Sequence, residues 1–247
     1  MELLEKIEIL LSYYKQGLLG GEFMPEDENP NLEKSSCQNY LYFTLPMALN
    51  YQRNSYTLWE SANKTYNDVE TRFVFDPKKV VESSFEKVQE ALTKYKVALQ
   101  KNKQTEVWIR LCNTIVNDFD GDVRNIFLKF HNNVNKIRKF MQIEEKKKFP
   151  YLSGTKICNY WLYVMSQYAD QRYEDPENLT VAPDTHLCKA TYHLGLITEE
   201  ELNSNNVQKL VIERWNQALK GTKYHPIDIH TPLWLWSRNG FKKIEKE

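Results

Sequence analysis

The sequence predicts an all-α fold, and three observations carry that prediction. Apolar residues recur three and four positions apart through most of the 247-residue chain, which is the spacing that lines one face of a helix. Glycine occurs only eight times, which argues against a chain of glycine-rich β-hairpins. The one strand-like stretch, TRFVFD near residue 73, is short.

The first half of the chain predicts a succession of helices. The N-terminal stretch MELLEKIEILLSYYKQ is amphipathic, and a loop around Pro30 separates it from the rest. Helical spacing then continues through residues 78–102 and 105–117. The sequence DFDGD breaks the pattern, and residues 121–142 resume it.

The second half adds helices with clear start and stop residues. A turn containing Pro150, Ser153 and Gly154 precedes an apolar helix. Asp184 follows a proline and is suited to cap the next helix, and Thr198 with Glu201 forms a capping box. The last two helices are expected at 206–220, where Gly221 ends the helix, and around the segment HTPLWLWSR, where Pro232 stands near the first turn.

Composition excludes several classes of protein. No apolar run reaches the roughly 18 residues that a membrane span requires, and the acidic N-terminus does not resemble a signal peptide. The four cysteines are scattered, which suits reduced thiols in the cytoplasm and excludes a clustered iron–sulfur site. The histidines fit no metal motif, so we expect no metal and no cofactor.

Charge is segregated along a chain whose formal net charge is zero. Residues 1–35 hold eight acids and three bases, whereas residues 133–156 hold seven bases and two acids. A neutral protein can therefore present a basic face to a polyanion. The alternative is that the lysine run at 146–148 only solvates the end of a helix.

Lys156 stands in an unfavourable place for a cation. It falls in the first turn of the helix after Gly154, where the helix dipole disfavours positive charge. A residue that breaks a local rule is a candidate functional residue, although an ordinary surface lysine is the competing interpretation.

Three segments together resemble the helix-hairpin-helix DNA glycosylase superfamily. They are SGTK at 153–156, VAPDTHLCKATYHLGLI with Asp184, and DIHTPLWLWSR near the C-terminus. The last two are most similar to the archaeal 8-oxoguanine DNA glycosylases. The resemblance implies one helical domain over 1–247, with an N-terminal half at about 1–120, a hairpin-containing half at about 121–247, and the active-site cleft between them.

The resemblance also implies roles for two residues. Lys156 would be the nucleophile and Asp184, 28 residues later, the catalytic carboxylate. Leu152 stands where the family has its first hairpin glycine. A helix that began earlier would move the nucleophile to Lys148 or Lys147.

The chemistry is physically reasonable. Backbone N–H groups of a hairpin and a helix N-terminus bind phosphate, so Ser153, Gly154 and Lys148 are the candidate DNA-phosphate contacts. A helix start and partial burial both favour the free amine of Lys156. An ionised Asp184 would stabilise an oxocarbenium-like transition state.

Aromatic and histidine residues suggest a pocket for a flipped base. Trp59, Tyr160 and Trp234 fall near positions that line the base pocket of the archaeal branch, although buried aromatic residues are usually core. His186 would contact a phosphate or orient Asp184. His230 would accept a hydrogen bond from the edge of the base.

The function expected from these residues is excision of an oxidised purine, 8-oxoguanine first, by an N-glycosylase with AP lyase activity through a Schiff base. Its partner would be DNA containing a damaged base, and we expect a cytoplasmic, nucleoid-associated monomer with no membrane contact. One alternative is an N-glycosylase of a modified nucleotide, similar to the queuosine-salvage enzymes. Another is a DNA-binding module without catalysis.

Overall fold

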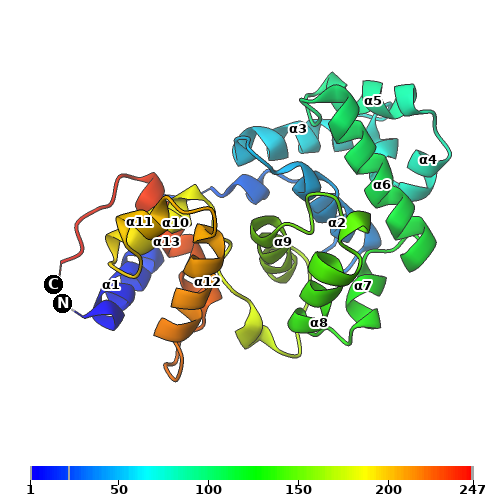
Figure 1. Ribbon diagram of the computed structural model, residues 1–247. Coiled ribbons are helices and arrows are strands. Elements are labelled where there is room, and N and C mark those ends of the chain that lie inside the picture. The colour runs from blue at the N-terminus through cyan, green and yellow to red at the C-terminus, as the bar shows by residue number, and fades with distance from the viewer. Residues whose placement is uncertain (1, 22, 246–247) are drawn as a thin grey trace. The chain divides into compact units, whose positions relative to one another are not determined.

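A computed structural model describes residues 2–21 and 23–245 (Figure 1). Over those residues, every regular element is a helix and no strand occurs, so the all-α prediction is confirmed. No helix in the described part of the chain is long and apolar enough to cross a membrane. The chain divides into two compact units, unit 1 with Met1–Phe23 and Glu177–Glu247, and unit 2 with Met24–Pro176. The predicted halves meet near residue 120, which lies inside unit 2.

Unit 1 combines the two ends of the chain. Its elements are α1 (Leu3–Lys15), α10 (Thr185–His193), α11 (Glu199–Leu202), α12 (Val207–Ala218), the 3-10 helix η7 (Pro226–Ile229) and α13 (His230–Arg238). Helix α13 packs against both α10 and α1. The fully buried Trp215 of α12 donates its indole N–H to Thr191 of α10 at 2.9 Å, which links these two helices by a buried hydrogen bond.

Gly21 allows a close approach inside unit 1. Its φ of +82° lies in the left-handed region, and a Cβ at this position would collide with the side chain of Leu235 in α13. The segment after α1 can therefore lie directly on α13 only because residue 21 lacks a side chain.

Unit 2 is larger and contains the helix that carries Lys156. Its elements are η1 (Pro25–Asp27), α2 (Cys37–Thr44), η2 (Pro46–Leu49), α3 (Ser55–Asn67), η3 (Arg72–Phe75), α4 (Pro77–Val81), α5 (Phe85–Lys94), α6 (Lys101–Phe119), α7 (Arg124–Lys129), α8 (Val134–Lys139), the π-helix η4 (Phe140–Glu144), η5 (Lys146–Lys148) and α9 (Thr155–Tyr168). The short 3-10 helix η6 (Pro176–Asn178) lies at the boundary between the units.

Aromatic side chains fill the centre of unit 2. Trp161 of α9 stacks on Phe127 with ring centroids 5.1 Å apart, and its indole N–H donates to Thr44 of α2 at 3.0 Å. Both rings are almost completely buried. Burial of a large aromatic side chain contributes roughly 2–3 kcal/mol, so α9 is held firmly along the core.

Three expectations about elements need correction. TRFVFD is no strand, because Arg72–Phe75 forms a 3-10 helix. The predicted helix 78–102 is interrupted, since the hydroxyl of Ser84 accepts from the Lys87 N–H and starts a new helix there. The predicted helix 121–142 divides into α7, α8 and η4, because His131 and Asn132 adopt left-handed backbone conformations after α7.

Other local predictions are confirmed. Asp120 and Gly121 have positive φ and end α6 at the DFDGD sequence. Asp184 caps α10, and Thr198 with Glu201 forms the capping box of α11.

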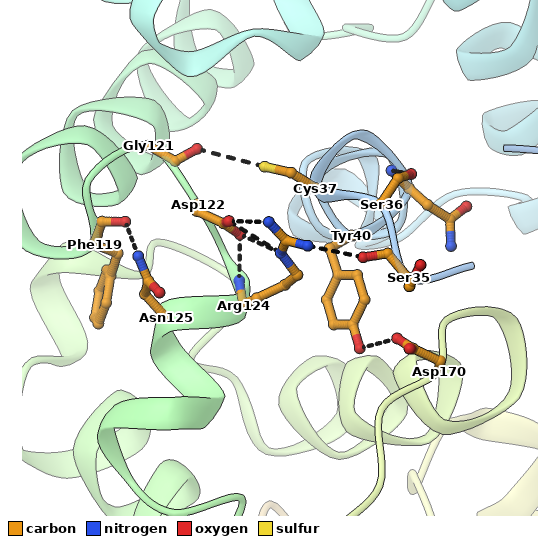
Figure 2. Close-up of polar contacts among 11 residues, drawn as sticks. Ser35, Ser36, Cys37, Tyr40, Phe119, Gly121, Asp122, Arg124, Asn125 and Asp170 are labelled. Carbon is orange, nitrogen blue, oxygen red and sulfur yellow. Dashed lines mark hydrogen bonds and ion pairs between the residues drawn. The ribbon is translucent and has the colours of Figure 1, made fainter. Parts of the chain in front are cut away.

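Arg124 fastens the start of α2 to the loop before α7, as Figure 2 shows. Its Nε donates to both carboxylate oxygens of Asp122 at 3.0 Å, and its Nη1 donates to the Ser35 carbonyl at 2.9 Å. Close by, the Tyr40 hydroxyl donates to Asp170 at 2.7 Å. All three nitrogens of the guanidinium donate hydrogen bonds to Asp122 or Ser35, so Arg124 is a structural clamp.

We expect Arg124→Gln to destabilise unit 2 by about 1 kcal/mol, because a half-exposed ion pair and one bond to a carbonyl are lost. Urea unfolding followed by fluorescence measures this. Arg172→Gln is the matched control, since Arg172 is exposed and forms none of the ion pairs found among residues 2–21 and 23–245. Equal stability of the two variants would contradict the clamp.

Candidate active site

A turn built from the chain's own backbone leads into the helix of Lys156. The Ser153 N–H donates to the Phe149 carbonyl at 2.8 Å, and the Gly154 N–H donates to the Tyr151 carbonyl at 2.9 Å. Tyr151 adopts a left-handed conformation with φ of +58°. Helix α9 begins at Thr155, so Lys156 is its second residue, in the first turn as predicted.

The free N–H groups at this site differ from those expected. The amides of Ser153 and Gly154 are occupied within the turn, and the Ser153 side chain is buried. Gly154 is the N-cap residue and supplies no side-chain acceptor. The first-turn N–H groups of residues 155–157 therefore lack a capping side chain, and they replace those of Ser153 and Gly154 as the candidate phosphate donors.

Lys148 is engaged elsewhere. Its ammonium pairs with Asp118 at 2.8 Å and with Glu145 at 3.4 Å, and those acids raise its pKa. Lys146–Lys148 forms a separate 3-10 helix before the turn. Neither Lys147 nor Lys148 is in the first turn of α9, so of the three candidate lysines only Lys156 occupies the helix position expected for the nucleophile.

Tyr160 follows Lys156 by one helical turn, so the two share a face of α9. Its hydroxyl hydrogen-bonds to Glu26, and burial followed by the charge of Glu26 raises the pKa of Tyr160 far above its ordinary value. The half-buried ring also contacts Tyr163, at 6.1 Å between centroids.

Glu26 is a residue that sequence reasoning missed. It is 1% exposed in η1, and its Oε1 accepts from the indole N–H of Trp59 at 2.8 Å. Among the described residues, its Oε2 has no hydrogen-bond partner. Burial raises the pKa of Glu26 to about 7, although the bonds from Tyr160 and Trp59 lower it in part. Glu26 is one of three acids in the segment MPEDENP, and no sequence pattern distinguishes it from the other two.

Trp59 lies in the core of unit 2. It is fully buried in α3, and its ring packs against Tyr42 and Phe43 with centroids 5.7 and 5.4 Å away. Its polar edge meets Glu26. Trp59 is thus placed to orient Glu26, a different arrangement from the expected stacking wall.

In unit 1, both oxygens of Asp184 accept hydrogen bonds. Oδ1 accepts from the Leu187 N–H at 2.9 Å, which caps α10, and Oδ2 accepts from the indole N–H of Trp234 in α13 at 3.1 Å. Two donors from two helices fix the carboxylate in one orientation. The bond to Trp234 goes beyond an ordinary helix cap and was not expected from sequence.

The rest of this cluster surrounds Trp234. The guanidinium of Arg238 lies 4.9 Å from its ring centroid, and the His186 ring meets it edge-on at 5.8 Å. Nδ1 of His186 lies 3.2 Å from the Ser237 hydroxyl. His186 therefore contacts Trp234, the residue that donates to Asp184.

His230 has a structural contact at its Nδ1. The ring is buried, and Nδ1 accepts from the Ala182 N–H at 3.3 Å, two residues before Asp184. This bond holds the loop that leads to Asp184. The predicted role of this residue at the edge of a base must therefore use another atom of the ring.

No protein-family model and no curated protein matches this chain. Within residues 2–21 and 23–245, no three His, Cys, Asp or Glu side chains form a group that could hold a metal ion. Two groups of polar contacts stand near the candidate residues. In unit 2, Glu26 contacts Trp59 and Tyr160, and Lys156 lies one helical turn before Tyr160 on α9. In unit 1, Asp184 and His186 both contact Trp234.

We expect Glu26 to make stability depend on pH. The pKa of Glu26 is about 7 in the folded protein and 4.5 in the unfolded chain. The buried neutral carboxyl group therefore contributes fully to the free energy of unfolding below pH 4.5, and this contribution is lost as the pH rises through 7 and the group ionises. The loss amounts to about 3 kcal/mol. Glu26→Gln, which keeps an acceptor for Trp59, should remove this part of the pH profile in urea unfolding from pH 4.5 to 8.

The control is Glu60→Gln, which replaces an exposed acid of α3 that pairs with Lys64. A constant stability difference between wild type and Glu26→Gln across the whole pH range would mean that Glu26 does not titrate there.

We also expect Asp184→Asn to leave one donor without an acceptor, since an amide has a single oxygen for the Leu187 N–H and the Trp234 indole. This should cost about 1 kcal/mol of stability. The double variant Asp184→Asn/Trp234→Phe removes the second donor and should recover most of that loss in thermal unfolding. Strictly additive effects of the two changes would show that the Trp234 bond is unimportant.

Proposed function

We propose that this protein is a DNA N-glycosylase and AP lyase that excises an oxidised purine, 8-oxoguanine first, with Lys156 as nucleophile and Asp184 as the catalytic carboxylate. The single observation that carries the proposal is the position of Lys156, an amine in the uncapped first turn of a helix that follows a tight backbone turn. The order of the three glycosylase-like segments in the sequence supports it.

The chemistry begins at the deoxyribose. The lone pair of the Lys156 amine forms a bond to C1′ while the bond from C1′ to the base breaks, and the base leaves with that electron pair and takes up a proton. Loss of a proton from the new amine and opening of the sugar ring give a Schiff base. β-Elimination then breaks the C3′–O bond and cleaves the strand.

Asp184 would act on the charge that develops in the first step. An ionised carboxylate stabilises positive charge on the sugar as the base departs. Its two fixed hydrogen bonds suit this role, because a carboxylate that is already oriented needs no reorganisation during the reaction.

Glu26 is a better candidate than His230 for the residue that recognises the base. 8-Oxoguanine carries an N7–H donor where guanine has a lone pair, so a buried acceptor would distinguish them. Oε2 of Glu26 has no partner among the described residues, while Trp59 and Tyr160 hold the rest of the carboxyl group. Loss of one such contact reduces discrimination by roughly 1–3 kcal/mol.

The test is single-turnover excision from duplexes that carry 8-oxoguanine, other oxidised bases or guanine, with the free base and the cut strand measured separately. We expect Lys156→Gln to abolish both products in a folded protein. Lys148→Gln is the matched control, since Lys148 pairs with Asp118, and it should retain activity. Full activity in Lys156→Gln would refute the proposal.

One observation favours the nucleotide-hydrolase alternative. The lysine run that would face DNA is partly neutralised, because Lys148 is paired with two acids. A modified nucleoside or its monophosphate, tested in the same assay, distinguishes the two functions. Release of a base from the free nucleotide, with none from DNA, would favour the hydrolase.

A further inference from the structure

The outer face of α6 and the turn before α9 border two hollows of about 300 and 350 Å³ that share Arg110. Lys103, Pro150 and Tyr151 line the first, and Lys147 lines the second. Together they make a groove within unit 2, here called the α6 groove, that none of the proposed catalytic groups uses.

The α6 groove has an excess of positive charge. Lys103, Arg110 and Lys147 are exposed, and none takes part in the ion pairs found in the described part of the chain. The acids along the groove are Asp118, which already pairs with Lys148, and Glu106. Three unpaired cations thus face one unpaired carboxylate, which favours a polyanionic ligand.

An aromatic platform stands at one end of the α6 groove. Tyr51, in the loop before α3, stacks on Tyr151 with centroids 5.3 Å apart and planes at 16°. The ammonium of Lys103 lies 5.6 Å from the Tyr151 ring centroid. Tyr51 is 48% exposed, which leaves its ring available to a ligand. The exposed ring of Tyr51, stacked on the partly buried Tyr151 beside Lys103, offers a flat surface next to a cation.

We propose that the α6 groove binds a single-stranded stretch of nucleic acid, with phosphates along Lys103, Arg110 and Lys147 and an unpaired base stacked on Tyr51. Cations follow the backbone and aromatic rings take the bases in proteins that bind single strands. The paired bases inside a duplex offer no free face to Tyr51, and a peptide of acidic residues alone has no flat ring to place there. The choice of nucleic acid rests on the proposed function, but the binding needs neither Lys156 nor a damaged base.

The test is fluorescence anisotropy of the full chain with two labelled 12-mers of equal charge, one of thymidines and one of abasic tetrahydrofuran units. Tyr51→Leu should weaken binding of the thymidine 12-mer about 5- to 150-fold, the range of base stacking on an aromatic side chain, and leave the abasic 12-mer unchanged. Arg110→Gln should reduce the slope of the logarithm of the binding constant against the logarithm of the salt concentration by about 0.7 for both probes, because one phosphate contact is lost.

Matched controls are Tyr14→Leu and Lys209→Gln, which replace an exposed tyrosine and an exposed lysine in unit 1 and should leave both affinities unchanged. Thermal unfolding verifies that each variant is folded.

Three outcomes would overturn the α6 groove as a single-strand site. The first is an equal loss of affinity for both probes in Tyr51→Leu. The second is that wild type does not bind the thymidine 12-mer. The third is that a polyglutamate peptide displaces that probe as efficiently as unlabelled thymidine 12-mer does. Lys156→Gln should bind both probes normally. Normal binding of the thymidine 12-mer by a protein without excision activity would refute the glycosylase alone.

Discussion

The turn from Phe149 to Gly154 is the constraint on which the candidate chemistry depends. It uses the amides of Ser153 and Gly154 internally and places Gly154 at the start of α9 without a capping side chain. The first turn of α9 is then a helix terminus whose N–H groups have no side-chain cap, and Lys156 lies in that turn. Any side chain at residue 154 that capped the helix would compete for the same N–H groups.

The core of unit 2 holds this helix terminus in place and links it to a second titratable group. Trp161 fixes α9 against α2 and α7, while Tyr160, on the face of Lys156, reaches Glu26. A carboxyl group that burial brings to a pKa of about 7 is unusual in a protein core, and such groups concentrate at functional sites. In unit 1, the single side chain of Asp184 has two structural contacts, because it caps α10 and accepts a hydrogen bond from Trp234 of α13.

Local sequence rules predicted much of the fold. Side chains that cap helices, such as Asp184 and Thr198, were identified correctly because their effect extends over only three residues. The helix expected at 78–102 was wrong because apolar spacing continued across Ser84, and its members Val81 and Leu99 are in fact exposed. Periodicity alone does not distinguish one helix from two whose apolar faces happen to align.

The candidate site was less accessible to prediction because its contacts join distant residues. Glu26 and Trp59 are hydrogen-bonded although 33 residues separate them in the sequence, and Trp234 and Asp184 although 50 do. No local sequence pattern marks either pair. His230 and Trp59 were selected as pocket residues, yet one holds the Ala182 amide and the other orients Glu26. Residue type indicated that these positions matter, whereas their roles required the three-dimensional contacts.

The central claim is that the amine of Lys156 forms the covalent bond to the sugar. The most direct measurement is borohydride reduction of the wild-type protein on 8-oxoguanine duplex, followed by proteolysis and mass spectrometry of the adduct. We expect a reduced deoxyribose fragment on the peptide that contains Lys156, attached at that residue. An adduct on Lys147 or Lys148, or excision of the base with no trapped protein, would contradict it.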